Sequence, residues 1–128
     1  MAHPNAELVM KGFEAFATGD MAAMDQLIAD EAVWHAAGRG VLSGDFRGKE
    51  AIFGLFAKTA QEAEMKQDVH AILADDEHVV ALVKSTATRR GKTVDMDQVF
   101  VFHVAGGKAV EVWLTPSDAY AADEFWAE

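Results

Sequence analysis

The chain has 128 residues, of which 51% are hydrophobic, and its formal net charge is −10. A chain of this length can bury one core, so we expect a single folded domain over residues 1–128. The negative charge argues against nucleic acid as a partner, because phosphates would be repelled. No apolar run of about 18 residues occurs, so no membrane span is predicted. The absence of cysteine fits a cytoplasmic protein.

Three helices are predicted in the N-terminal half, where apolar residues recur at helical spacing. They are expected at 4–18, from Asp20 to about 28, and at 49–64. Gly19 suits the left-handed position that ends a helix, and Asp20 is a typical cap for the next one. The inner face of the third helix is predicted to carry Ile52, Phe53, Phe56 and Ala60.

The strands are predicted mainly in the C-terminal half. One short strand at 32–37 precedes a glycine-rich loop, and four longer strands follow the third helix, at 66–74, 78–89, 93–104 and 108–115. Turn residues separate the four. The order ααβαββββ, with a short helix from Ala119 to Trp126 after it, keeps helices and strands apart. This segregation predicts an α+β fold, a curved antiparallel sheet packed on three N-terminal helices.

The last two strands indicate which face of the sheet is apolar. Pairing across Gly106-Gly107 gives the opposed pairs Phe102–Val110, Phe100–Val112 and Gln98–Leu114. Because side chains alternate along a strand, these residues share one face with Val94, Met96 and Val104. We expect this face to line the interior. The other face carries Asp95, Asp97, Val99, Val101, His103, Glu111 and Trp113, and its exposed Val and Trp predict a homodimer through the sheets.

Two stretches of the chain resemble a known family: DEAVWHAAGRGVLSGDFRGKEAIFGLF, from Asp30 to Phe56, and GGKAVEVWLTPSD near the C-terminus. They look like the SnoaL-like branch of the nuclear transport factor two superfamily, and the resemblance covers roughly the whole chain as one domain. The superfamily holds ketosteroid isomerases, polyketide cyclases, dehydratases and epoxide hydrolases in a cone-shaped domain that usually dimerises. The resemblance implies a pocket for a small hydrophobic or aromatic ligand. It implies no particular reaction, since one fold hosts many chemistries.

The resemblance does not extend to the catalytic groups of the ketosteroid isomerases. In those enzymes a first-helix tyrosine and a late-strand aspartic acid hold the oxyanion, and a first-strand aspartate is the base. The corresponding positions here fall on Gly12, on Phe100 (or Val99 without a gap) and on Ala36. All three lack the required group, so the chain is predicted not to be a steroid isomerase.

His35 and Asp118 are the candidate catalytic residues. Trp34 and His35 belong to a VWH motif common in SnoaL-like sequences. In a regular strand Trp34 points inward and His35 points to the surface or to an interface, whereas a bulge would turn His35 to the pocket mouth. There it could shuttle a proton near neutral pH. Asp118 either caps the C-terminal helix or acts on substrate as a carboxylate at the pocket rim.

The predicted pocket wall is mainly aromatic and consists of Phe16, Trp34, Phe53, Phe56, Met96, Gln98, Phe100 and Leu114. Gln98 is its principal polar group, and a buried amide needs either a neighbouring side chain or a ligand as partner. No pair of histidines has metal-ligand spacing and no glycine-rich phosphate loop occurs, so we expect neither a metal nor a cofactor.

Two functions remain open at this point. One is an isomerase-, cyclase- or dehydratase-type enzyme that transfers protons on an apolar or aromatic carbonyl compound. The other is a non-catalytic binding domain for a hydrophobic ligand. No feature of the sequence favours a protein-interaction module.

Overall fold

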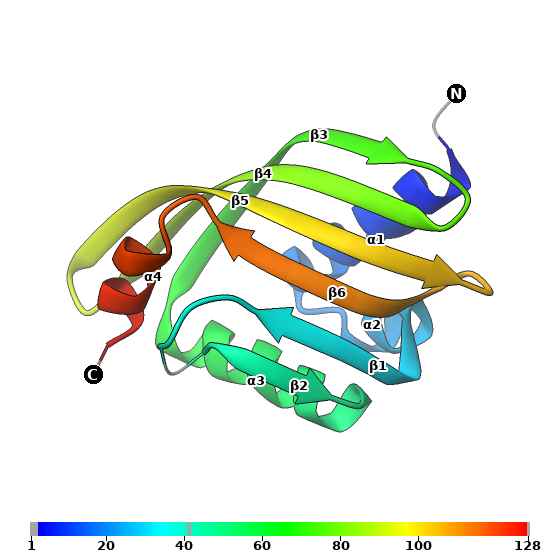
Figure 1. Ribbon diagram of the computed structural model, residues 1–128. Coiled ribbons are helices and arrows are strands. Elements are labelled where there is room, and N and C mark those ends of the chain that lie inside the picture. The colour runs from blue at the N-terminus through cyan, green and yellow to red at the C-terminus, as the bar shows by residue number, and fades with distance from the viewer. Residues whose placement is uncertain (1–2, 41, 128) are drawn as a thin grey trace.

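The computed structural model describes residues 3–40 and 42–127. Four helices and six strands lie in this part of the chain, and they confirm the predicted α+β class (Figure 1). In chain order they are α1 (Pro4–Thr18), α2 (Met21–Leu27), β1 (Ile28–Ala36), β2 (Gly44–Arg47), α3 (Lys49–Glu62), β3 (Glu64–Ala74), β4 (His78–Arg89), β5 (Lys92–Ala105), β6 (Lys108–Pro116) and α4 (Ala119–Trp126).

Local chemistry ends α1 and begins α2 where the sequence predicts. Gly19 adopts a left-handed conformation, with φ of 71°, that few other residues adopt without strain. Its backbone N–H donates to the last carbonyls of α1. The carboxylate of Asp20 then accepts from Ala23 N at 3.1 Å, which satisfies one of the free N–H groups that begin α2. Together these two residues turn the chain back toward the sheet.

The strands form one curved sheet in the order β2-β1-β6-β5-β4-β3. All neighbours are antiparallel except β1 and β6, which run parallel. The sequence did not indicate β2, which lies within the predicted glycine-rich loop. This strand has four residues at the sheet edge, too few to show a period-two pattern.

The predicted register of the β5–β6 hairpin is wrong by two residues. Phe102 lies opposite Val112, and Phe100 lies opposite Leu114. The register shifts next to His103, where Val104 pairs with Ala109. A β-bulge adds one residue to one strand, and a hairpin sequence alone does not locate it. Because a two-residue shift keeps each side chain on its face, Val112 and Leu114 still point inward, whereas Ala109 takes the inner place predicted for Val110.

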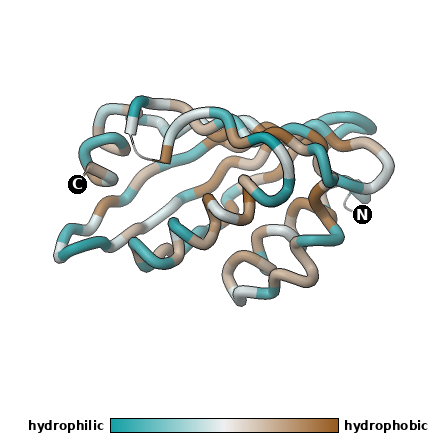
Figure 2. The backbone as a smooth tube through the Cα atoms, turned by 90° about the horizontal axis from the view of Figure 1, so that it is seen from below, coloured by the Kyte–Doolittle hydropathy of each residue, from teal (hydrophilic) through white to brown (hydrophobic). Residues whose placement is uncertain are grey.

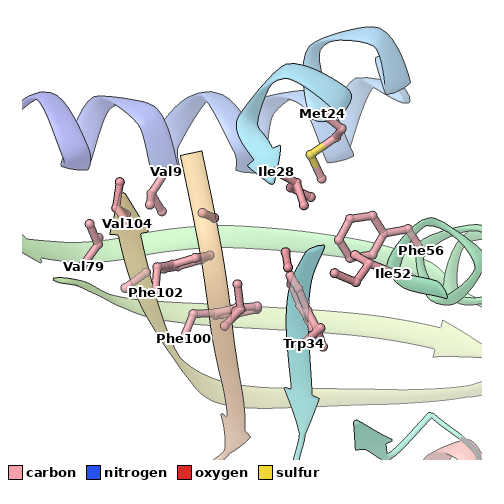
Figure 3. Close-up of a cluster of buried hydrophobic side chains, with 14 of the residues drawn as sticks. Val9, Met24, Ile28, Trp34, Ile52, Phe56, Val79, Phe100, Phe102 and Val104 are labelled. Atoms are coloured by element: carbon pink, nitrogen blue, oxygen red, sulfur yellow. The ribbon is translucent and has the colours of Figure 1, made fainter. Parts of the chain in front are cut away.

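Helices α1, α2 and α3 cover one face of the sheet, and the apolar side chains lie between the two layers (Figures 1 and 2). Figure 3 shows Val9 of α1 above Phe102 and Val104 of the sheet, and Met24 of α2 beside Ile28. The buried stripe of α3 is Ile52, Leu55 and Phe56. Ala60 was predicted on this inner face but is exposed, since it falls outside the stripe.

A buried arginine fixes α4 to the end of the sheet. Arg89, at the end of β4, is only 5% exposed. Its Nη1 donates to the carbonyl oxygens of Phe125 at 3.0 Å and Ala127 at 2.8 Å. The guanidinium also lies 3.4 Å from the carboxylate of Glu62 and 5.8 Å from the centre of the Trp126 ring. This one side chain therefore satisfies carbonyls at the C-terminal end of α4.

Replacing Arg89 by Met should lower the free energy of unfolding by about 2 kcal/mol, because the two carbonyls and Glu62 lose their buried donor. Urea unfolding followed by circular dichroism would measure the change. Arg90→Met is the matched control, since Arg90 is 60% exposed and reaches Glu62 only at 4.0 Å. Equal losses in both variants would contradict the anchoring role of Arg89.

Candidate functional site

A cavity of about 170 Å³ lies between the helices and the inner face of the sheet. Six of the eight residues predicted for the pocket line it: Phe16, Trp34, Phe56, Gln98, Phe100 and Leu114. Aliphatic side chains from α1, α2, β1 and α3 complete much of the wall, among them Leu8, Val9, Met24, Leu27, Ile28 and Leu55. The wall is therefore predominantly apolar, which is typical of a small-molecule site.

The other two predicted residues, Phe53 and Met96, do not line this cavity. Phe53 is half-buried beside Phe56, with ring centres 6.2 Å apart, because α3 turns Ile52, Leu55 and Phe56 inward instead. Met96 lines a second space of about 30 Å³, closed by Phe125 and Trp126 of α4. Gln98 borders both spaces.

The three positions that carry the catalytic groups of steroid isomerases all face the main cavity. Gly12 on α1, Ala36 on β1 and Phe100 on β5 line its wall. None of these side chains can donate or accept a proton. The prediction that the chain is not a steroid isomerase rests on these three residues and stays a prediction.

Two buried polar atoms of the cavity wall have no hydrogen-bond partner within residues 3–40 and 42–127. They are Trp34 Nε1, a donor, and Gln98 Oε1, an acceptor. Other polar groups of the wall are satisfied within the protein: Thr59 Oγ1 donates to Leu55 O at 2.9 Å, and Ser43 Oγ donates to Ala37 O at 3.0 Å. A buried polar atom without a partner costs about 1–3 kcal/mol. Such atoms are rare in folded proteins, where buried polar groups bond to the protein, to ordered water or to a ligand.

A carboxylate that the sequence did not indicate lies at the edge of the cavity. Asp123 of α4 lines the wall. Its oxygens accept from the backbone N–H groups of Arg39 at 2.9 Å and Gly40 at 3.0 Å. Gly38 has φ of 104°, and a Cβ there would lie 2.5 Å from Asp123 Oδ1. The glycine-rich loop therefore allows the close contact that holds α4 against the β1–β2 connection.

Asp118 lies outside the cavity wall and caps α4. It accepts from Ala121 N at 3.0 Å and is exposed. The structure thus shows the capping alternative, and the carboxylate that lines the cavity is Asp123, five residues later. The signal available in the sequence was the glycine at both 38 and 40, which indicates a close backbone contact without naming the partner.

His35 lies on the opposite face of the sheet from the cavity, because side chains alternate over residues 32–36 of β1 and Trp34 points inward. Its Nδ1 is 2.7 Å from Asp45 Oδ1, and its Nε2 is 2.5 Å from Glu111 Oε2. The imidazole stacks on Trp113, with ring centres 5.6 Å apart. The hydrogen bond to Asp45 is the largest cause that raises the pKa of His35 above its ordinary value of 6.5, and the hydrogen bond to Glu111 is the second. The catalytic roles of His35 and Asp118 stay predictions, and their positions place neither beside a ligand in the cavity.

Two further features of the described residues bear on the kind of site. No three His, Cys, Asp or Glu side chains in this part of the chain lie where they could hold a metal ion together. Among the same residues, no helix is both long enough and apolar enough to cross a membrane.

The chain matches the model of the SnoaL-like domain over residues 9–112 and therefore belongs to this family. It is 32% identical over 124 residues to the uncharacterised protein Rv0034 of Mycobacterium tuberculosis H37Rv, covering 94% of this chain and 95% of that protein. This match confirms the resemblance to SnoaL-like proteins that the sequence indicated.

Solved structures show the same fold. Bal32a, from a soil-derived mobile gene cassette, is 36% identical with a TM-score of 0.92, and the match covers 96% of both chains. A protein of Jannaschia sp. CCS1, named as a SnoaL-like polyketide cyclase, has a TM-score of 0.83 over 97% of this chain and 92% of its own. At 17% identity this second likeness concerns the fold alone.

The ion pairs of His35 predict a stability that depends on pH. Because the folded pKa of His35 is raised, its contribution is fully present below the unfolded value of 6.5 and is lost as pH rises through the folded value. The hydrogen bond to His35 is the main cause that lowers the pKa of Asp45 from its ordinary value of 3.8. As pH falls, the contribution of this pair to stability is therefore lost only below pH 3.8. The melting temperature of His35→Gln should therefore fall furthest below wild type between pH 4 and 6.5, and less at pH 9.

Differential scanning calorimetry across this range would measure both proteins. His70→Gln, at an exposed position on β3, controls for the loss of a histidine elsewhere. A His35→Gln deficit that stays constant from pH 5 to pH 9 would rule out the charged pairs as its cause.

Proposed function

We propose that the protein binds a neutral hydrophobic or aromatic small molecule in the main cavity. The observation that carries this proposal is an apolar wall without a lysine, arginine or histidine among the described residues. Its carboxylate, Asp123, already accepts two backbone hydrogen bonds. An anionic ligand would lose its hydration here without gaining a counter-charge, and a cation would meet only a carboxylate that already accepts these two hydrogen bonds. A neutral aromatic compound would instead gain from burying apolar area.

A second candidate function is an isomerase-, cyclase- or dehydratase-type enzyme that transfers protons on an apolar or aromatic carbonyl compound. The observation in its favour is the Asp123 carboxylate in the cavity wall, since a positioned carboxylate can act as a general base. The Jannaschia protein named as a polyketide cyclase supports it as a relative in fold. With Gly12, Ala36 and Phe100 in the wall, such an enzyme would not be a steroid isomerase.

The proposal also includes a homodimer that forms through the outer face of the sheet, and a cytoplasmic location. Val99 is 36% exposed on this face, beside half-buried Val101 and Trp113, which supports an apolar contact surface. The cytoplasmic location is supported by the absence of cysteine from the sequence.

Filling the cavity should abolish binding without harming the fold. Gly12 lies within α1 on the cavity wall, and a Cβ there meets no atom within 4 Å, so Gly12→Leu adds a side chain at the cavity without a clash at its Cβ. The affinity for diphenylmethane, a neutral aromatic hydrocarbon, should fall by more than about tenfold, as measured by equilibrium dialysis.

Gly54→Leu is the matched control for this change. Gly54 lies within α3, is exposed and has the same free space around its Cβ, but it does not line the cavity. Both substitutions favour the helix by up to about 1 kcal/mol, so only the cavity distinguishes them. Unchanged affinity in Gly12→Leu would overturn the proposed site.

Trp113→Glu should shift the protein toward monomer in sedimentation velocity, because it puts a charge into the proposed contact surface. Tyr120→Glu is the control, since Tyr120 is an aromatic residue that is 89% exposed on α4, away from the sheet face. A dimer mass retained in Trp113→Glu would exclude this surface.

A further inference from the structure

We propose that the ligand of the main cavity carries two separate polar groups on a neutral aromatic frame: an acceptor for Trp34 Nε1 and a donor for Gln98 Oε1. The chemical class is that of aromatic ketones with a hydroxyl group at a distance from the carbonyl. This inference rests on the proposed binding function and specifies its ligand.

The indole of Trp34 is held so that its N–H cannot turn away to find another partner. Trp34 is only 9% exposed. Its ring packs edge-on against Phe56 at 5.1 Å and against Phe100 at 6.2 Å between ring centres. Figure 3 shows Trp34 lying among these aromatic side chains, between the sheet and α3. An indole N–H can only donate, so the complementary ligand atom must be an acceptor.

The neighbours of Gln98 explain why its buried oxygen has no partner in the protein. On β4 the paired residue is Val83, and on β6 it is Pro116. Neither side chain can donate, and proline also lacks a backbone N–H. Gln98 borders both cavities, and its oxygen is buried. The complementary ligand group is therefore a donor, such as a hydroxyl.

The register of the strands places residues 34 and 98 at different levels of the sheet, with the level of Phe100 between them. Trp34 pairs with Val112 on β6, which pairs with Phe102. Gln98 precedes Phe100 by two residues on the same face, and such neighbours are about 6.5 Å apart along a strand. The proposed ligand therefore carries its acceptor and its donor at a spacing of about the width of an aromatic ring or more. A hydroxyl directly beside the carbonyl would bond internally and could not serve both side chains.

A set of four compounds on one frame separates the two hydrogen bonds. Diphenylmethane has neither group, benzophenone has the acceptor, 4-benzylphenol has the donor, and 4-hydroxybenzophenone has both. Equilibrium dialysis would give their affinities for wild type, Trp34→Phe and Gln98→Leu. Each affinity is divided by that for diphenylmethane in the same protein, so changes in packing cancel.

In wild type, we expect benzophenone and 4-benzylphenol each to bind about two- to tenfold more tightly than diphenylmethane, and 4-hydroxybenzophenone to combine both gains. Trp34→Phe should remove the gain of benzophenone and keep that of 4-benzylphenol. Gln98→Leu should do the reverse, and its melting temperature should equal or exceed that of wild type, since it removes an unsatisfied amide. The isomer 2-hydroxybenzophenone should bind no better than benzophenone.

The outcomes distinguish this inference from the function on which it rests. If none of the compounds binds wild type, the proposed binding function fails. If diphenylmethane binds and Gly12→Leu blocks it, but all four compounds bind equally, only the two-group ligand is overturned. The assignment of the two partners would be overturned by the opposite pattern. In that case Gln98→Leu would remove the higher affinity of benzophenone over diphenylmethane, and Trp34→Phe would keep it.

Discussion

Aromatic packing between the helices and the sheet is the interaction on which the cavity depends. Edge-to-face contacts join Phe16 and Trp34 to Phe56 on α3, and Phe13 on α1 to Phe100 on β5, with ring centres 5.1–5.5 Å apart. Edge-to-face rings keep this separation because the edge of one ring is attracted to the face of the other. The rings therefore hold α1 and α3 away from the curved sheet, and the space between them stays partly open. Smaller aliphatic residues would let the layers approach and close it.

Alternation of side chains between the register shifts then gives the two faces of the sheet different chemistry. On β1, Trp34 enters the aromatic layer while His35 joins Asp45, Glu111 and Trp113 outside. The inner face has few polar groups, so each one affects binding strongly. The outer face has paired charges, which respond to pH and to salt. A one-residue slip of β1 would exchange these environments, which is why the register of this strand matters for both faces.

The sequence predicted those features that local chemistry determines. Gly19 and Asp20 set the turn between the first two helices, and alternation placed Gln98 and Phe100 on the inner face even though the hairpin register was wrong. Contacts between distant segments were not predictable in the same way. The short edge strand β2 depends on β1 for its hydrogen bonds, and Asp123 meets Arg39 and Gly40 across 84 and 83 residues of chain. A helical segment such as AADEFW gives no sign of which carboxylate turns inward.

The unsatisfied groups of the wall distinguish the cavity from a packing defect. An empty space in a core that serves only stability is usually lined by apolar atoms, and phenylalanine or leucine at positions 34 and 98 would avoid the cost of burying unpaired polar atoms. Tryptophan and glutamine instead place one donor and one acceptor beside the space. Burying a donor and an acceptor costs free energy unless both gain hydrogen-bond partners. In the proposed complex, a complementary ligand would supply these partners, and its specificity would come from a few polar atoms in a predominantly apolar wall.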